Sequence, residues 1–95
     1  MHVITKKRLD EFSKIHPDSR KALGTWHRII KNNRFKSFNE LREYFPGADI
    51  IGRLTVFNIG GNKTRLIASI HFNRGKLYIR HVLTHDEYNK GKWRE

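Results

Sequence analysis

The fold is decided by residues 66–83, LIASIHFNRGKLYIRHVL, which contain two apolar segments joined by a short polar turn. Residues 64–72 and 77–83 alternate in the manner of β-strands, and Asn73-Arg74-Gly75 between them is typical of a hairpin turn. If Phe72 lies opposite Leu77, one face of the hairpin is almost wholly apolar and must be buried under other elements. That face would contain Leu66, Ala68, Ile70, Phe72, Leu77, Ile79, His81 and Leu83.

The opposite face of this hairpin mixes charged and apolar side chains. Arg65 and His71 of the first strand would stand beside Tyr78 and Arg80 of the second. A shift of the register by one residue would bring Tyr78 and Arg80 into the core, so we reject that pairing. We therefore expect an open, solvent-facing side of the sheet with Arg65, Ile67, Ser69, His71, Tyr78, Arg80 and Val82.

Before this hairpin, residues 54–59 have the alternation of a further strand. Gly60-Gly61 predicts a two-residue turn, because both glycines can adopt positive φ, and such a turn pairs Ile59 with Asn62. Three strands joined by short turns form an antiparallel meander, one face of which must be covered by helices. The pairing adds Leu54, Val56 and Asn58 to the open face.

The first half of the chain has helical spacing instead. Apolar residues three and four apart predict a helix over residues 6–15, capped by Thr5, and a second helix from Pro17 to about residue 32. Ser37 and Glu40 resemble a capping box for a third helix over residues 38–44, and residues 2–4 look like a short strand. We therefore predict one α+β domain over residues 1–95, mainly helical over 1–48 and an antiparallel meander with a C-terminal segment over 50–88. The N-terminal strand and helices would pack on one face of a small antiparallel sheet.

Composition excludes several classes of protein. The 95 residues include 20 Lys and Arg, 9 Asp and Glu and no Cys, and the formal charge is +11. Without cysteine there is no disulfide, no thiol nucleophile and no Cys-based zinc site. No apolar run is long enough to span a membrane and the N-terminus does not resemble a secretory signal, so we expect a cytoplasmic protein. So much positive charge favours a polyanionic or acidic partner, of which nucleic acid is the first candidate.

The open face also carries the strongest candidates for a functional site. Arg65 and Arg80 could bind phosphate oxygens with planar, two-pronged hydrogen bonds. His71 and Tyr78 could stack on a base, and Lys63 would lie at the edge of the face. The alternative is a solvated sheet face, whose basic residues only keep the strands soluble.

Metal binding is a weaker interpretation of the histidines. His81 and His85 are four residues apart, but the register places His81 in the core, where a buried histidine is more common than a metal ligand. No acidic pair has the spacing of metal ligands on a helix. We expect neither a metal nor another cofactor.

Three segments are specific enough to suggest a family: residues 56–66 (VFNIGGNKTRL), 78–80 (YIR) and 84–88 (THDEY). With the opening residues 1–5 (MHVIT), they resemble the HigB-type toxins of bacterial toxin–antitoxin modules, which belong to the RelE-like superfamily. The resemblance covers nearly the whole chain. It implies a small α+β fold, an endonuclease that cuts mRNA in the A site of translating ribosomes, and a HigA-type antitoxin. DNA would be met only through that antitoxin.

The resemblance also implies site residues. Arg65 and Arg80 match strand positions that hold the scissile phosphate, and His85 and Tyr88 match the C-terminal segment that lines such sites. RelE-like enzymes often use several lysines, and only Lys63 has a counterpart here.

Metal-free cleavage of RNA uses the 2′-hydroxyl as the nucleophile and requires a base, an acid and cations at the phosphate. We assign Arg65 and Arg80 to the phosphate, His85 to proton transfer, Tyr88 to the nucleotide and Lys63 to the backbone or to acid–base chemistry. The residues assigned to RNA binding are His71, Arg74, Lys76 and Tyr78. The alternatives are a non-catalytic basic RNA-binding module that uses the same face and a basic structural protein of a ribonucleoprotein.

Overall fold

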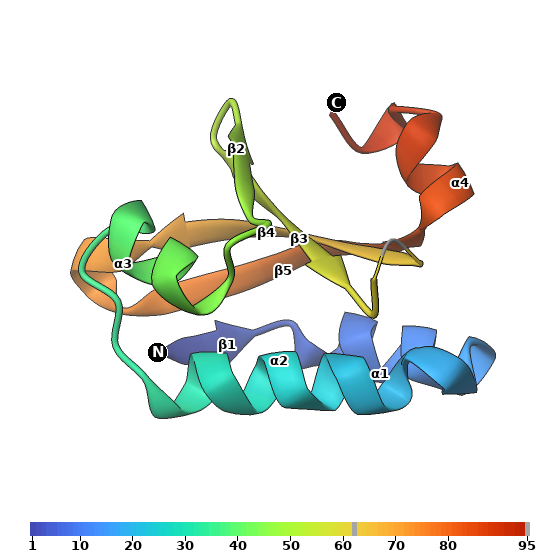
Figure 1. Ribbon diagram of the computed structural model, residues 1–95, viewed down its shortest axis with the longest axis horizontal. Coiled ribbons are helices and arrows are strands. Elements are labelled where there is room, and N and C mark those ends of the chain that lie inside the picture. Colours follow the sequence, from blue (N-terminus) through green and yellow to red (C-terminus); the bar gives the residue numbers. More distant parts are fainter. Residues whose placement is uncertain (62, 95) are drawn as a thin grey trace.

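The computed structural model describes residues 1–61 and 63–94, and its architecture is α+β, as predicted (Figure 1). A five-stranded sheet has the order β1-β5-β4-β3-β2, in which β1 runs parallel to β5 and the other neighbours are antiparallel. The strands are β1 (His2–Ile4), β2 (Asp49–Ile51), β3 (Leu54–Ile59), β4 (Thr64–His71) and β5 (Lys76–Thr84). The helices are α1 (Lys6–Ile15), α2 (Arg20–Asn32), α3 (Phe38–Tyr44) and α4 (His85–Asn89), with 3₁₀ turns at Pro17–Ser19, Phe72–Arg74 and Lys92–Arg94.

Local sequence signals account for most of these elements. The bounds of α1, α3 and β3 are the predicted ones, whereas β2 and α4 were not predicted. Ser37 caps α3, because its hydroxyl accepts a hydrogen bond from the backbone N–H of Glu40 at 3.3 Å. The predicted cap at Thr5 is wrong. Thr5 has a φ of 66°, its hydroxyl donates to the carbonyl of Ile4, and its side chain accepts no hydrogen bond from the first turn of α1 among the described residues.

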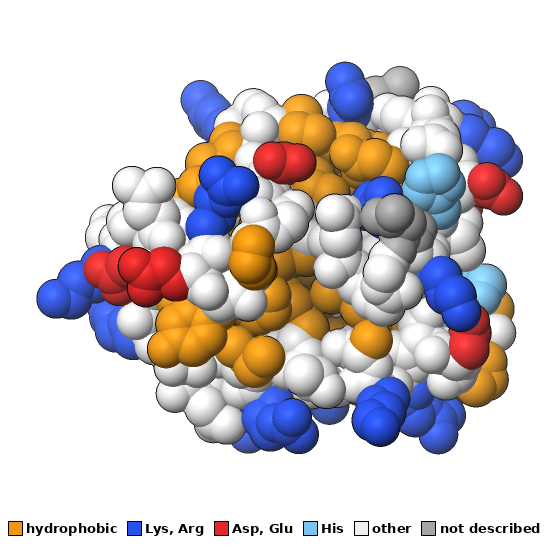
Figure 2. Space-filling model, in the orientation of Figure 1, with side chains coloured by type: hydrophobic (Ala, Val, Ile, Leu, Met, Phe, Trp, Pro, Cys, Tyr) orange, Lys and Arg blue, Asp and Glu red, His pale blue; other side chains and the backbone are white. Residues whose placement is uncertain are grey.

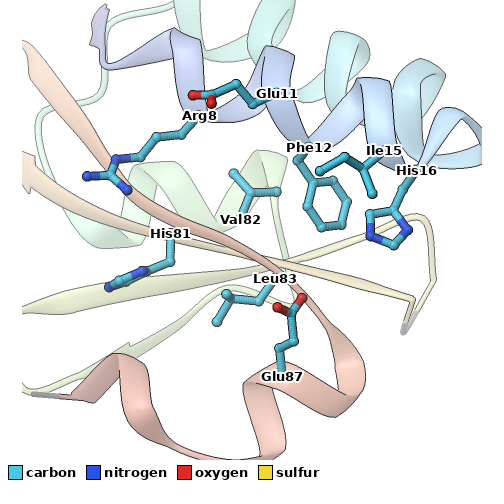
Figure 3. Close-up of a pocket in the computed structure, with 9 residues that line it drawn as sticks. All are labelled: Arg8, Glu11, Phe12, Ile15, His16, His81, Val82, Leu83 and Glu87. Atoms are coloured by element: carbon cyan, nitrogen blue, oxygen red, sulfur yellow. The ribbon is translucent and has the colours of Figure 1, made fainter.

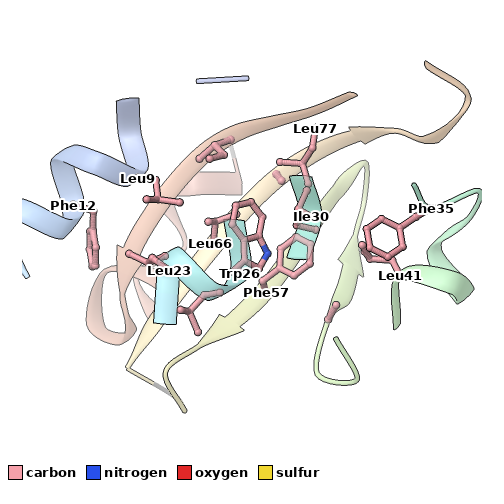
Figure 4. Close-up of a cluster of buried hydrophobic side chains, with 14 residues drawn as sticks. Leu9, Phe12, Leu23, Trp26, Ile30, Phe35, Leu41, Phe57, Leu66 and Leu77 are labelled. Carbon is pink, nitrogen blue, oxygen red and sulfur yellow. The ribbon is translucent and has the colours of Figure 1, made fainter. Parts of the chain in front are cut away.

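The helices α1 and α2 lie together on one side of the sheet (Figure 1). Leu23, Trp26 and Ile30 of α2 are spaced three and four residues apart, so all three side chains face the sheet. They form the main core with side chains of the strands, among them Leu66 and Leu77 (Figure 4). Within the part of the chain that the structure describes, no helix is long and apolar enough to cross a membrane.

The other face of the sheet is also covered. α4 and the 3₁₀ turn Lys92–Arg94 lie on the side opposite α1 and α2 (Figure 1). Trp93 is 3% exposed and packs in a second cluster with Val56 and Ile67. The indole N–H of Trp93 donates to the carbonyl of Tyr88 at 2.9 Å, and the two rings stack with centroids 5.1 Å apart. The prediction that this face is open is therefore wrong over the area that Tyr88 and Trp93 cover.

A β-bulge in β5 changes the predicted register. Ala68 lies opposite Ile79, but the next pair joins Ile67 to His81. Arg80 is therefore an extra residue without a partner on β4.

The pairing of β4 with β5 differs from the predicted one on both sides of the bulge. Leu77 lies opposite Ile70 rather than Phe72, so the predicted hairpin pairing is wrong. Beyond the bulge, the alternation of faces is the reverse of the expected one. His81 and Leu83 lie on the face that Trp93 covers in part, which we call the second face, and Val82 packs against the main core in their place.

The turn between β3 and β4 is longer than predicted. Ile59 lies opposite Thr64, so the turn contains residues 60–63 and not Gly60-Gly61 alone. Both glycines have positive φ, 61° and 64°, as predicted, while Asn62 lies outside the described residues. The longer turn shifts the pairing by two residues, an even number, so the faces of β3 are as expected.

Replacing Trp93 with alanine should lower the free energy of unfolding by about 3–5 kcal/mol, because it removes the largest side chain of the second cluster and uncovers Ile67. Denaturant unfolding followed by circular dichroism measures the loss. The control is Ile50→Ala, which truncates a half-exposed side chain on β2 and should cost less than about 1 kcal/mol. Equal unfolding midpoints for Trp93→Ala and the parent would show that the C-terminal segment does not stabilise the sheet.

Candidate active site

The bulge in β5 brings two consecutive basic side chains to one face of the sheet. In a regular strand, consecutive side chains point to opposite faces. Here Tyr78 lies opposite Ser69 and His81 opposite Ile67, all on the second face, and the extra residue Arg80 is inserted between them. Arg80 and His81 therefore lie side by side on the second face, which a regular strand does not permit.

Arg80 borders a hollow of about 360 Å³ on this face. Tyr78 and His71 also line the hollow, and their rings meet edge to face with centroids 5.5 Å apart. Thr5 and Arg8 close it on the side of α1. An aromatic ring, an imidazole and guanidinium groups around one opening suit a nucleotide, because the base can stack and the phosphate can bind arginine.

A groove of about 440 Å³ lies farther along β5 and shares Arg8 with the hollow (Figure 3). β1 pairs only with residues 76–78 of β5, so the remaining edge of β5 is bordered by α1. Arg8 lines both cavities and extends from α1 toward His81, while Glu87 points into the same space from α4 (Figure 3). We call the hollow and the groove together the β5 groove. Its other side chains beyond the hollow are Glu11, Phe12, Ile15, His16, Val82 and Leu83.

Two titratable side chains of the β5 groove have shifted pKa values. Burial lowers the pKa of His81, and the positive charges of Arg8 and Arg80 lower it further, so the imidazole is uncharged at neutral pH. The backbone N–H of Thr84 donates to the Glu87 carboxylate at 2.9 Å, and chiefly this hydrogen bond lowers the pKa of Glu87. No three His, Asp or Glu side chains among the described residues lie close enough together to hold a metal ion.

The predicted site residues fall into separate groups. Tyr78, Arg80 and His71 lie together in the β5 groove. Lys63 and His85 lie at the far end of β5, where the backbone N–H of His85 donates to the carbonyl of Lys63 at 3.1 Å. Arg80 and His85 are five positions apart in the sequence, which corresponds to about 16 Å of extended strand.

Arg65 lies on the predicted face but beneath Tyr88. Its side chain is 9% exposed, and its guanidinium carbon is 5.3 Å from the centroid of the Tyr88 ring. Its Nη1 is buried and has no hydrogen-bond partner among the described residues. In this arrangement a phosphate cannot touch that nitrogen, although the charge of Arg65 still acts at longer range.

The remaining two predicted RNA-binding residues lie next to the hollow. Lys76 begins β5 opposite His71, which itself lines the hollow. Arg74 is exposed on the turn that precedes β5. Both can therefore contact a chain that extends from the hollow past the β4–β5 turn.

Sequence reasoning missed Arg8, His81 and Glu87. Arg8 comes from a helix, and no strand pattern connects it with β5. His81 was assigned to the core because a bulge interrupts the alternation without an evident sequence signal. Glu87 could have been found, because Thr84 and Glu87 have the spacing of a capping box and form one in the structure.

The fold and the β5 groove define a small α+β protein that presents a basic surface suited to an extended anionic chain. A family model, described as HigB toxin, the RelE-like toxic component of a toxin–antitoxin system, matches residues 19–91. The mRNA interferase HigB of Escherichia coli O6:H1 is 33% identical over 93 residues, which cover 95% of this chain and 90% of the relative. The mRNA interferase toxin HigB of Escherichia coli K12 is 36% identical over 92 residues, which cover 94% of this chain and 88% of the relative. This chain therefore belongs to the HigB family of RelE-like toxins.

Glu87→Ala should lower the free energy of unfolding at neutral pH by a few tenths to about 1 kcal/mol, because it removes half of the capping box of α4. The pKa of Glu87 is lower in the folded chain than in the unfolded chain. Its contribution is therefore present above the unfolded pKa and is lost as the pH falls through the folded one.

Denaturant unfolding of parent and variant at neutral and at acid pH tests this prediction. The difference between the two proteins should shrink toward the low-pH end. Glu43→Ala, at an exposed position of α3, is the control for the loss of a surface carboxylate. A difference for Glu87→Ala that is the same at every pH would contradict the assignment.

Proposed function

We propose that this chain is a ribosome-dependent endoribonuclease that cleaves mRNA and so inhibits translation and growth. The observation that carries the proposal is the β5 groove, in which Arg80, Arg8 and Tyr78 surround one opening. Strand β5 holds Arg80 and Tyr78 in position. The proposal is further supported by the relatives, which are named mRNA interferases. Cleavage would take place without a metal, through the 2′-hydroxyl of the RNA.

In the proposed site the β5 groove binds the scissile nucleotide. Tyr78 stacks on a base, with His71 at its edge, and Arg80 binds the phosphate with its planar guanidinium. Negative charge builds up on the phosphate in the transition state, and fixed cations stabilise it most effectively. Arg65 adds to this positive potential from beneath Tyr88.

Residues outside the groove guide the rest of the message. Arg74 and Lys76 bind the RNA backbone beyond the β4–β5 turn. Lys63, His85 and Tyr88 lie at the opposite end of β5, where they can contact nucleotides on the other side of the scissile bond. The sequence-based assignment of proton transfer to His85 stays a prediction.

The ribosome supplies the affinity and the alignment that so small a site lacks. Of 20 Lys and Arg, only Lys6 forms an ion pair within the described residues, with Asp10 at 3.5 Å. Lys and Arg side chains are spread around the outline of the face in Figure 2, with few Asp and Glu among them. Such a distribution can bind ribosomal RNA without selecting a sequence, while the ribosome holds the message in the A site.

The partner of the toxin is an antitoxin, which we propose to be of the HigA type. An acidic or extended segment of the antitoxin would bind the basic surface of this chain. It would either cover the β5 groove or hold the toxin where it cannot enter the ribosomal A site, and we favour the second mode slightly. This chain would then contact DNA only indirectly, through the antitoxin.

Arg80→Ala should abolish toxicity while the protein stays folded. Removal of one preorganised contact to the transition state typically costs about a hundredfold to a thousandfold in rate. Arg80→Lys should recover little activity, because an ammonium group cannot form the two-pronged contact. Growth after induction without antitoxin, together with the mRNA ends produced, gives the measurement.

Arg28→Ala is the matched control, because Arg28 is exposed on α2, which packs on the other face of the sheet. It should arrest growth as the parent does. If a folded Arg80→Ala protein arrests growth equally fast, Arg80 is not catalytic. Small, graded losses of RNA affinity for each removed cation, without any cleavage by the parent, would favour the alternative of a non-catalytic RNA-binding module.

Binding of the antitoxin should weaken several-fold as the salt concentration rises, because salt screens attraction between exposed charges. Calorimetric titration of toxin with antitoxin at increasing NaCl gives the dissociation constants. A series with a neutral solute at matched osmolality is the control. A dissociation constant that does not change with salt would contradict an electrostatic mode of binding.

A further inference from the structure

His81 is placed beside Arg80 by the bulge in β5, and it is half-buried in the β5 groove. Its backbone is fixed by pairing with Ile67, whose side chain is fully buried in the second cluster. A group mounted on a paired strand keeps its position precisely, as proton transfer requires. The neighbouring Arg80 is the proposed phosphate ligand, so His81 lies at the place where the reacting atoms would be.

We propose that His81 is the general base that takes the proton from the 2′-hydroxyl, and that Arg8 binds the same phosphate from the opposite wall of the groove. This inference rests on the proposed function as an RNA-cleaving enzyme. It assigns proton transfer to a residue that the sequence pattern placed in the core, and it adds a helix residue to the site.

The surroundings of His81 suit a base. Burial lowers its pKa, and Arg8 and Arg80 lower it further, so the imidazole has a free lone pair at neutral pH. The same two guanidinium groups attract a phosphate, which would bring the 2′-hydroxyl near the imidazole. The other titratable groups of the surrounding walls are Glu11 of α1, His16 directly after α1, Glu87 of α4, and Lys90 and Lys92 after α4.

His85 is less suited to this role in the structure. It is exposed at the first position of α4, a helix of only five residues. Its Nδ1 is 3.3 Å from the side-chain nitrogen of Asn89, at hydrogen-bond distance, so a neutral His85 would have one ring nitrogen occupied there. It also lies about 16 Å of extended strand from Arg80, whereas His81 is the next residue after Arg80.

The imidazole of His81 accepts the proton of the 2′-hydroxyl, and the 2′-oxygen forms a bond to phosphorus. The bond from phosphorus to the 5′-oxygen breaks, and that oxygen takes a proton from water in the open groove. The hydroxide so formed is neutralised by the proton on His81. The products are a 2′,3′-cyclic phosphate and a 5′-hydroxyl, and no oxidant, reductant or metal takes part.

The test is single-turnover cleavage of mRNA on programmed ribosomes across a range of pH. The parent is measured first, with an mRNA that carries a 2′-deoxynucleotide at the cleavage site as the chemical control. If the parent does not cleave RNA on ribosomes, or cleaves the deoxy substrate equally fast, the proposed function itself fails. If it cleaves only the ribose form, the assignment of the base can be examined separately.

In the parent, the rate should rise with pH about a midpoint below the ordinary pKa of histidine and then level off, because the base has to be uncharged. His81→Gln should lower the rate by about a hundredfold to ten-thousandfold and remove the rising limb of the profile. His27 lies on α2, away from the β5 groove, so His27→Gln is the matched control. This variant should keep the parent's rate and the rising limb of the pH profile. A folded His81→Gln protein that retains the parent's rate, or loses rate but keeps the limb, overturns the proposal.

A second measurement does not depend on the folding of a variant. Titration of the histidine ring signals of the parent by NMR gives the pKa of each imidazole. The kinetic pKa should equal that of His81. Agreement with His85 instead, together with loss of the limb in His85→Gln, overturns the proposal and supports the sequence-based assignment.

Arg8→Ala should reduce the rate of cleavage with little loss of binding to the ribosome, whereas Arg28→Ala should leave the rate of cleavage unchanged. Ribosome binding is measured by co-sedimentation, so that loss of the phosphate contact is distinguished from loss of docking. An unchanged rate for a folded Arg8→Ala protein shows that α1 contributes no phosphate contact.

Discussion

Strand β4 is buried on both of its faces, and the rest of the structure depends on this constraint. Leu66 and Ile67 are consecutive residues that point to opposite sides, and both are fully buried. Leu66 packs in the main core under α2, and Ile67 packs in the second cluster with Trp93. Since each side chain contributes about 1.5–3 kcal/mol only if it is covered, the chain has to supply a layer on each side of the sheet.

The two layers are unequal, and the difference determines where the groove can form. The helical layer is continuous, whereas the C-terminal layer is a five-residue helix and one 3₁₀ turn. The C-terminal layer covers the part of the second face near Val56 and Ile67 and leaves Tyr78 and Arg80 accessible. The groove therefore lies on the part of the second face that the C-terminal layer does not cover. Its floor is rigid because the same strands are held from behind by the main core.

How much of this could be predicted from the sequence depends on the range of the interactions involved. Helices α1 and α3 and strand β3 follow from local spacing and turn residues, and their bounds were correct. The register of β5 was wrong by two residues before the bulge, which leaves the faces unchanged, and by one residue beyond it, which reverses them, because a period of two carries no sign of an inserted residue. The cover formed by Tyr88 and Trp93 was missed because two aromatic residues among polar ones do not form a recognisable pattern over so short a segment. Of the site, Tyr78, Arg80 and His71 were brought together as predicted, while Arg8 and His81 depend on long-range packing.

Arg65 shows how the two layers link stability to charge. Its guanidinium lies under Tyr88 with one nitrogen lacking a hydrogen-bond partner among the described residues, and such a group usually costs free energy. No ion pair of the described residues compensates it, since the one that they form joins Lys6 to Asp10 on α1. Arg8, Arg80 and Arg65 thus add their fields at the groove, and none of the three forms an ion pair among the described residues, although Glu11 and Glu87 also line it. A site that binds and stabilises a phosphate gains from this imbalance, because an internal carboxylate would compete with the substrate for each guanidinium. The net charge of +11 is therefore consistent with a fold whose cations are left for a partner rather than used for its own stability.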